Sequence, residues 1–219
     1  HHKYLELLSE ACREYNIHLI ADEIAVGFGR TGTMFGFQQA KITPDIICLS
    51  KGITGGYMTL STILTTDDIY DAFYDEYEKL NAFLHSHSYT ANPIACSAAN
   101  ATLDIFKDKD VIKKNKILSA HIRKCFESLK DHPHVSDVRQ KGMVLAIELI
   151  KDKKRKVSYD WKERRGIRAY LHGLKNNVLM RPLGNVLYFM PPYVITKKEI
   201  SFVSEIMKEG VDEATKKNS

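Results

Sequence analysis

The sequence predicts an α/β protein in which a mostly parallel sheet with helices is followed by a small α+β domain. Two short apolar runs, 17–21 and 46–49, have the composition of buried strands. Helical patterns alternate with the strand candidates of the first half, as they do in parallel α/β sheets. A His-Pro pair at 132–133 then interrupts a helical pattern, and a different series of elements follows. We therefore expect one domain at 1–131 and a second at 132–219.

The first domain is expected to begin with an amphipathic helix at about 3–15. Its apolar residues recur at helical spacing: Leu5, Leu8, Ala11, Cys12 and Tyr15. The two apolar strands follow, with a glycine-rich loop between them, and a third strand candidate lies at 59–65. Two helices complete the domain, one from Pro93 to about 106 and one from about 111 to 130.

The second domain is expected to contain short strands among helices. The apolar patterns predict a strand at 144–150, a helix at 161–175, two short strands at 178–183 and 186–190, and a final helix at 197–213. This mixture is typical of a small α+β domain.

The composition is that of an ordinary globular protein. Hydrophobic residues make up 44% and charged residues 27% of the 219 positions, so a substantial core can form. The net charge of +5 is mild. Its sharpest basic run, 151–156, contains no aromatic residue, which favours a solvated loop over a nucleic-acid site. No stretch approaches the ~20 apolar residues that span a bilayer.

The cysteines and the chain start complete the general picture. Cys12, Cys48, Cys96 and Cys125 lie far apart and form no Cys-x-x-Cys pair, so we expect reduced thiols and a cytoplasmic protein. The chain opens on a helix that leads into a strand, without an initiator methionine. We therefore expect a further N-terminal portion to precede it.

Two of the predicted strands end in charged residues, Asp22 and Lys51. In open α/β sheets, ligands bind just beyond the carboxyl ends of the strands. If these strands are parallel, both side chains lie at that edge, and the glycines around them let the backbone approach a ligand closely.

A carboxylate and a lysine in this arrangement match the needs of pyridoxal phosphate. Lys51 would form an imine with the cofactor aldehyde, and Asp22 would pair with the ring nitrogen and keep it protonated. The displaced Lys51 would then carry the proton of the substrate Cα. Its ammonium pKa must fall toward neutrality for that work, which partial desolvation and a neighbouring positive charge provide.

A different class of protein also fits an acidic pair after a buried strand. In a nucleotide hydrolase, Asp22 and Glu23 would hold magnesium, and a phosphate loop of the form G-x-x-x-x-G-K-[ST] would be required. The nearest match begins at Gly27, has Thr33 in place of the lysine, and follows the acid rather than preceding it. The alternative is weakened but stays open, because a preceding portion of the chain could supply the loop.

Two segments resemble signatures of class III aminotransferases. Residues 22–32 read DEIAVGFGRTG, and residues 44–52 read PDIICLSKG at the appropriate distance downstream. The resemblance implies part of the large domain of a fold-type I pyridoxal-phosphate-dependent transferase, with Lys51 as the Schiff-base lysine and Asp22 on the ring nitrogen. It also implies that Ile24 packs on one face of the ring, where a plain core role is equally compatible.

A third segment of the family pattern lies at 85–93, which reads HSHSYTANP. The resemblance implies that Ser88, where the family usually has threonine, binds the cofactor phosphate across the interface of a homodimer with a shared active site. His85 and His87 alternate and suggest a metal site, but no cysteine or acid stands at ligand spacing, so we expect no metal.

Two further segments resemble one branch of this family, whose members transaminate 8-amino-7-oxononanoate with S-adenosylmethionine in biotin synthesis. Residues 55–61 read GGYMTLS, and residues 181–193 read RPLGNVLYFMPPY. The likeness implies that Arg181 binds the substrate carboxylate, for which a guanidinium is well shaped, and that Tyr188 lines the same pocket. Arg30 is implied near the cofactor and either substrate.

Other readings of the same residues remain. Another class III aminotransferase, acting on an ω-amino acid or on ornithine, would share the cofactor residues. Arg181 would otherwise be an exposed arginine at a strand end, Tyr188 a half-buried strand tyrosine, and Arg30 a loop arginine on a carbonyl. A chain without its N-terminal portion would also lack the family's phosphate loop, and alone would bind the cofactor poorly.

Overall fold

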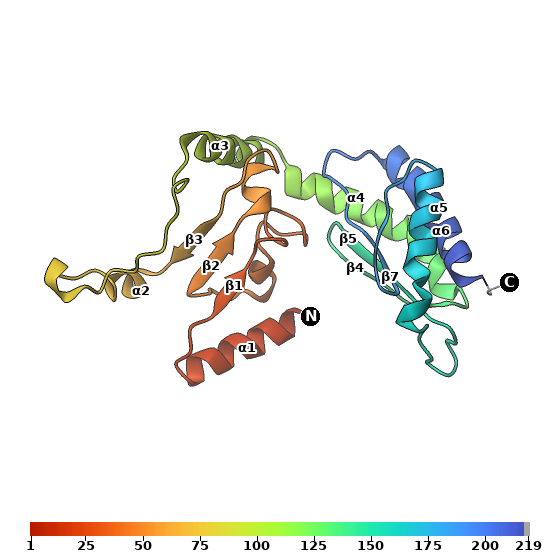
Figure 1. Cartoon of the computed structure of the whole chain (residues 1–219), viewed down its shortest axis with the longest axis horizontal. Coiled ribbons are helices and arrows are strands. Elements are labelled where there is room, and N and C mark those ends of the chain that lie inside the picture. The colour runs from red at the N-terminus through yellow and green to blue at the C-terminus, as the bar shows by residue number, and fades with distance from the viewer. Residues whose placement is uncertain (217–219) are drawn as a thin grey trace. The chain divides into compact units, whose positions relative to one another are not determined.

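The computed structural model describes residues 1–216 and divides into two compact units, residues 1–112 and the residues from Lys113 onward (Figure 1). The units meet earlier in the chain than the predicted boundary at 131/132. The physical reason is helix α4 (Val111–Phe126), whose side chains Leu118, Ile122 and Phe126 are buried in the core of the second unit.

The first unit is built on a three-stranded sheet with the order β1-β2-β3. Helix α1 (His2–Glu14) leads into β1 (Ile20–Asp22), which runs parallel to β2 (Ile46–Leu49). Strand β3 (Thr62–Thr65) pairs with β2 in the antiparallel direction. A parallel crossover needs about a dozen residues or more, and the connection between β1 and β2, residues 23–45, is long enough for one.

Asp45 aligns the two parallel strands at their amino ends. Its Oδ2 accepts a hydrogen bond from the backbone N–H of Leu19 at 2.7 Å, and its own N–H donates to the Leu19 carbonyl at 2.9 Å. The ladder that follows pairs Ile20 with Ile46 and Asp22 with Cys48. The carboxyl ends of β1 and β2 therefore lie side by side.

Shorter elements complete the first unit. The 3₁₀ turn η1 (Gly36–Ala40) lies in the loop after β1, and η2 (Lys51–Thr54) directly follows β2. Helix α2 (Asp67–Asp71) and the turn η3 (Tyr77–Lys79) lie on an arm that extends away from the sheet (Figure 1). Helix α3 (Pro93–Asp108) returns to pack against η2.

Helix α3 begins where its sequence predicts. Pro93 occupies the first turn, and the Asn92 side chain accepts from the backbone N–H groups of Ile94 and Ala95 at 3.0 and 3.2 Å. Ala99 on this helix joins Phe28 in the small core of the unit.

The second unit is an antiparallel sheet covered by helices. Its strands have the order β4-β5-β7-β6. Their bounds, with those of the remaining elements, are η4 (Glu127–Asp131), β4 (Val135–Lys141), β5 (Val144–Leu149), η5 (Trp161–Glu163), α5 (Arg165–Lys175), β6 (Arg181–Leu183), β7 (Val186–Phe189) and α6 (Lys197–Thr215). The expected strands and helices of this half are present, and β4 is an addition.

Strand β4 escaped sequence reasoning because its alternation is interrupted. The pairing with β5 shifts between Val135 and Asp137, as at a β-bulge. The two valines of the strand, Val135 and Val138, therefore have odd spacing, although Val135 is buried in the core and Val138 packs against that core. A strict period of two does not detect such a strand.

The sheet of the second unit has two unlike faces. Leu145, Ile147 and Leu149 of β5 are buried in the core. On the other face, the register aligns Arg139, Ala146, Tyr188 and Arg181 in one row across the four strands. This second face is partly exposed and polar, so it is available for functional side chains.

A buried arginine joins the ends of two helices in this unit. Arg165, 5% exposed, donates to the carbonyls of Ala214 and Lys216 at 3.1 and 2.5 Å, which leaves fewer unpaired carbonyls at the end of α6. The guanidinium also contacts Glu163 and lies 4.5 Å from the ring centroid of Tyr159. The hydrogen bond from Arg165 lowers the pKa of Glu163.

Within residues 1–216, each helix is too short or too polar to cross a lipid bilayer.

We expect Ile147→Ala to lower the free energy of unfolding by about 3 kcal/mol, because the side chain is fully buried and the truncation leaves a cavity. Urea denaturation followed by circular dichroism would measure the change. The matched control is Ile117→Ala on α4, where the side chain is 53% exposed and the expected loss is below about 0.5 kcal/mol. Equal losses in the two variants would contradict the assignment of Ile147 to the core.

Candidate functional site

The carboxyl ends of β1 and β2 bring Asp22 and Lys51 to one edge of the first sheet. Asp22 is the last residue of β1 and lies opposite Cys48, and Lys51 follows Cys48 by three residues along β2 and its continuation. Both side chains are exposed. The edge at which parallel strands end is where α/β sheets bind ligands.

Each of the two charged groups keeps bonding capacity for a ligand. Asp22 Oδ1 accepts from the N–H of Ile24 at 3.0 Å, which fixes the carboxylate against its own loop. Among residues 1–216, its second oxygen and the Lys51 ammonium make no hydrogen bond or ion pair. The acid can therefore accept from a ring N–H, and the amine can react with a carbonyl.

Glu23 has a structural role, unlike its neighbour Asp22. Its side chain is 3% exposed, and its two carboxylate oxygens accept from the backbone N–H groups of Gly36 and Phe37, each at 2.9 Å. The carboxylate thus holds the start of η1. An oxygen pair committed to these donors is not available to bind magnesium, which argues against a nucleotide hydrolase that uses Asp22 and Glu23.

The backbone at Lys51 has an unusual conformation. Its φ is +45°, in the left-handed region that side-chain-bearing residues seldom adopt. Gly55 and Gly56 nearby have φ values of +61° and +86°, which glycine adopts without cost. Strained conformations of this kind cluster at functional sites, where the surrounding structure holds them in place.

The loop after β1 carries two further residues that the sequence predicts for the site. Ile24 follows Asp22 by two residues and is half-buried, and Arg30 lies further along the same loop and is also half-buried. Ser88 lies apart, in an exposed turn before α3. That turn is held by the His87 N–H, which donates to Thr90 Oγ1 at 3.1 Å, and by the Thr90 N–H, which donates to the His87 carbonyl at 3.0 Å.

Arg181 and Tyr188 belong to the second unit, where they are neighbours across β6 and β7. Arg181 is exposed, and no other group among residues 1–216 pairs with its guanidinium. Both residues line a cavity of about 540 Å³ whose other walls are largely apolar, with Phe189, Met190 and Phe202 among them. An unpaired guanidinium at an apolar wall suits a carboxylate on an aliphatic chain.

Glu199, which lines the same cavity, does not neutralise Arg181. Its Oε2 accepts from the Thr196 N–H at 2.7 Å and from Thr196 Oγ1 at 2.8 Å, in a capping box at the start of α6. The hydrogen bond from the Thr196 backbone, more than the one from its hydroxyl, lowers the pKa of Glu199.

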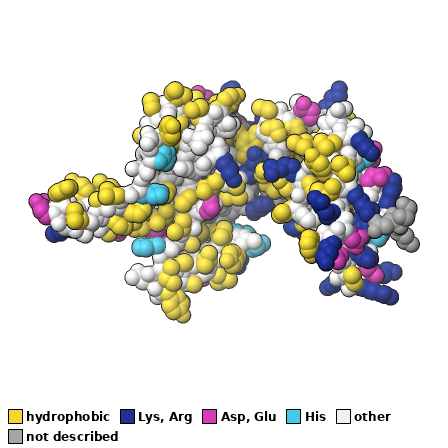
Figure 2. Space-filling model, viewed as in Figure 1, with side chains coloured by type: hydrophobic (Ala, Val, Ile, Leu, Met, Phe, Trp, Pro, Cys, Tyr) yellow, Lys and Arg dark blue, Asp and Glu magenta, His cyan; other side chains and the backbone are white. Residues whose placement is uncertain are grey.

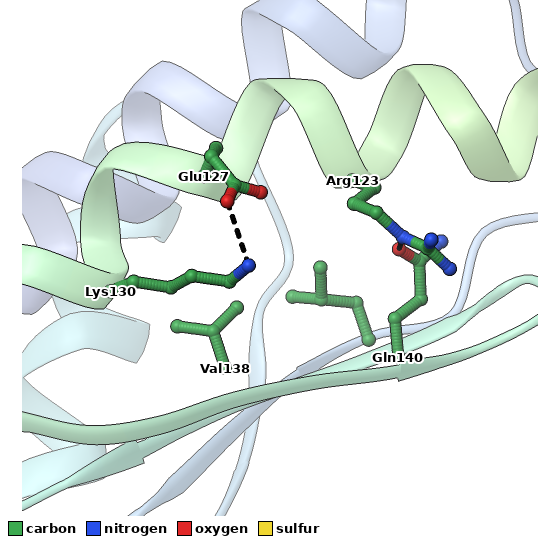
Figure 3. Close-up of a pocket in the computed structure, with 6 residues that line it drawn as sticks. Arg123, Glu127, Lys130, Val138 and Gln140 are labelled. Carbon is green, nitrogen blue, oxygen red and sulfur yellow. Dashed lines mark hydrogen bonds and ion pairs between the residues drawn. The ribbon is translucent and has the colours of Figure 1, made fainter.

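A smaller cavity of about 250 Å³ lies between α4 and the sheet of the second unit (Figure 3). Lys130 Nζ pairs with Glu127 Oε1 at 2.7 Å, and Arg123 Nε donates to Gln140 Oε1 at 3.4 Å. Val138 forms part of its apolar wall. None of the predicted site residues lines this cavity, and its charged groups already have partners.

In the part of the chain that the structure describes, no three His, Cys, Asp or Glu side chains come together as metal ligands would. His85 and His87 belong to that part. Neither of them joins a group that could hold a metal ion.

Comparison with protein-family models matches residues 1–211 to "Aminotransferase class-III". A curated relative from Helicobacter pylori, an adenosylmethionine-8-amino-7-oxononanoate aminotransferase, is 47% identical over 218 residues, which are 98% of this chain and 48% of that protein. A relative of the same name from Methanocaldococcus jannaschii is 42% identical over 219 residues. The chain spans about half the length of the curated relatives it matches.

Solved structures show the same likeness. The crystal structure of the Methanocaldococcus jannaschii enzyme superposes with a TM-score of 0.90 at 41% identity, over 96% of this chain and 49% of that one. An ω-transaminase from Pseudomonas jessenii, in complex with PMP, gives a TM-score of 0.90 at 29% identity, over 97% of this chain and 47% of that one.

We expect Glu23→Ala to lower the free energy of unfolding by about 2 kcal/mol, because it leaves the N–H groups of Gly36 and Phe37 without their acceptors. Thermal and urea melts would measure the loss. Glu23→Gln keeps one acceptor oxygen and should lose less. The control Glu10→Ala removes an exposed carboxylate of α1 and should be nearly neutral. If Glu23→Ala melted like Glu10→Ala, the structural role would be disproved.

Proposed function

This chain belongs to the class III aminotransferase family, and we propose that the whole protein transfers an amino group with the help of pyridoxal 5′-phosphate. Its α/β architecture is part of the fold of fold-type I transferases. The observation that carries the proposal is the parallel pairing of β1 and β2, which ends in Asp22 on one strand and leads to Lys51 on the other. In this proposal, the first unit is the C-terminal part of the cofactor-binding large domain, and the second unit is the small domain.

The residues at the strand ends fit this cofactor. Asp22 keeps a carboxylate oxygen for the ring N–H, Ile24 follows on the same loop to pack on the ring, and Lys51 offers an unpaired amine. When bound, pyridoxal phosphate supplies an electron-accepting ring and an aldehyde that combines with amines.

Each side chain then has a distinct task. Asp22 would accept a hydrogen bond from the ring N–H and so stabilise the positive charge there. Lys51 Nζ would hold the cofactor in the resting protein and, once released, would take the proton from the substrate Cα and return it. Ser88 donates its hydroxyl to the phosphate, and Arg30 lies on the loop that faces the substrates.

Arg181 is proposed to bind the carboxylate of the amino acceptor, with Tyr188 beside it. The unpaired, exposed guanidinium and the apolar walls of its cavity support this role. An acceptor with a terminal carboxylate and a long aliphatic chain fits that chemistry, and 8-amino-7-oxononanoate has both. The names of the relatives support this substrate, with S-adenosylmethionine as the donor, and so the formation of 7,8-diaminononanoate in biotin synthesis.

The whole protein is proposed to act as a cytoplasmic homodimer with a shared active site. Large apolar side chains are exposed along the arm of the first unit, including Tyr77, Phe83 and Leu84, and Figure 2 shows hydrophobic groups gathered there. Apolar surface of this extent is typical of protein interfaces. Ser88 lies on the segment between this arm and α3, which supports a phosphate contact made across the interface.

We expect borohydride to fix pyridoxal phosphate covalently on Lys51 of the full-length protein, because this amine lies at the strand ends. The absorption spectrum before and after reduction, with peptide mapping, would locate the adduct. Lys51→Ala should abolish it, and Lys3→Ala, which changes an exposed lysine of α1, should leave it intact. An adduct at a different lysine would refute the assignment.

We expect Arg181→Met to raise the KM for 8-amino-7-oxononanoate about 10- to 100-fold, because hydrogen bonds to charged groups contribute about 1.5–3 kcal/mol. The half-reaction with the amino donor should be unchanged. Arg139→Met is the matched control on the same sheet face, since that arginine is paired with Glu148.

Substrate profiling decides between the branches of the family. Strong turnover of β-alanine or ornithine, with none of the oxononanoate, would favour an ω-amino acid or ornithine aminotransferase. An Arg181→Met enzyme with an unchanged KM would remove Arg181 from the substrate site.

A further inference from the structure

Phe28, in the loop after β1, contacts the turn η2, which begins at Lys51 and is called the lysine turn below. A Cβ atom built on Gly52 would lie 2.9 Å from Phe28 Cδ2 and 3.1 Å from Phe28 Cβ. These distances are shorter than carbon atoms normally approach. Gly52 directly follows Lys51, so the Phe28 ring lies against the backbone that carries the amine.

Gly52 is glycine because of this contact and not because of its own conformation. It is absent from the residues with positive φ, in contrast to Gly55 and Gly56. An alanine could adopt the backbone conformation of Gly52, and the three atoms nearest to its methyl group would all belong to the Phe28 side chain.

Phe28 itself is held in a costly conformation. Its φ is +55°, a true outlier for a bulky side chain. Lys51, which directly precedes Gly52 on the other side of the contact, has a φ of +45°. Two strained residues on facing loops indicate that packing between the loops fixes both of them.

The ring is fixed on its other sides by the small core of the first unit. Phe28 is 3% exposed and lies edge-on to Phe35, with ring centroids 5.7 Å apart. The ring of Phe106 on α3 lies 6.2 Å away. Leu49 and Ile53, which flank the lysine turn, belong to the same core. Phe28 therefore has little freedom to move, and its packed ring restricts the position of Gly52.

We propose that Phe28 is a positioning residue, which seats Gly52 and so sets the place of the Lys51 amine relative to Asp22. The inference rests on the proposed function, because it assigns Phe28 a task in the work of that lysine. Asp22 ends β1 and Phe28 lies on the loop that follows it, whereas Lys51 and Gly52 begin η2 after β2. A rigid contact between the loops keeps the carboxylate and the amine at a constant separation, as two groups that bind one rigid ring require.

The test uses the full-length protein and the rate at which borohydride traps limiting pyridoxal phosphate on Lys51, resolved from other lysines by peptide mapping. For Phe28→Leu we expect this rate to fall about tenfold or more, because misplacement by about 1 Å costs up to about 10²-fold. Acylation of Lys51 by a small activated ester in the cofactor-free protein should stay unchanged, because that reagent needs no orientation.

Two further variants separate positioning from stability. Phe126→Leu makes the same change at a fully buried phenylalanine of the second unit. It should lower the Tm comparably and leave trapping at Lys51 unchanged. Gly52→Ala approaches the contact from the opposite side, by adding the excluded methyl group, and should slow trapping as Phe28→Leu does.

Unchanged trapping in both Phe28→Leu and Gly52→Ala would overturn the inference, and so would an equal loss in Phe126→Leu. A change in the acylation of Lys51 that parallels the loss of trapping would also overturn it. The substitution would then have changed the exposure of the lysine rather than the position of its amine. If the unmodified protein trapped no cofactor on Lys51, the proposed function itself would fail. That result is distinct from a defect confined to the variants.

Discussion

The parallel pairing of β1 and β2 is the constraint on which the candidate site depends. Asp45 fixes the amino ends of the strands through two hydrogen bonds with Leu19, and the ladder then sets Asp22 opposite Cys48. A slip of one residue would turn every side chain of a strand to the other face of the sheet. The register therefore decides that a carboxylate and an amine reach the same edge.

Contacts within the loops beyond these strands hold the candidate site in place. Glu23 turns inward and holds the start of η1, so its neighbour Asp22 is left to face outward. Lys51 and Phe28 both adopt left-handed backbone conformations, whose cost the surrounding core offsets. Adjacent acids with the same chemistry thus differ, because backbone donors occupy both oxygens of Glu23 and only one oxygen of Asp22.

In the second unit, two arginines that lie in one row of the sheet likewise differ in whether they have an ion-pair partner. Arg139 Nη1 donates to Glu148 at 2.7 Å and to Asp137 at 3.2 Å, and the bond to Glu148, more than that to Asp137, raises the pKa of the guanidinium. Arg181, at the opposite edge strand, has no such partner within residues 1–216. The sheet register, rather than residue type, decides that Arg139 is paired and that Arg181 is not, among the residues that the structure describes.

The sequence by itself determined the features that depend on neighbouring residues. Apolar runs predicted β2 with its observed bounds, Asn92-Pro93 marked the start of α3, and Asp22 and Lys51 lie, as predicted, where two neighbouring strands end. Such signals lie within one segment, because periodicity, capping and strand ends are local properties. The bulged strand β4 was missed where that local pattern is broken.

The tertiary structure alone decided the features that depend on residues far apart in the chain. The antiparallel direction of β3, the inward turn of Glu23 and the contact of Phe28 with Gly52 each join separate segments. The composition of each segment does not indicate which distant segment it will contact. Packing between distant residues has no sequence period, and for that reason only the folded chain shows which acid is structural and which ring supports the lysine turn.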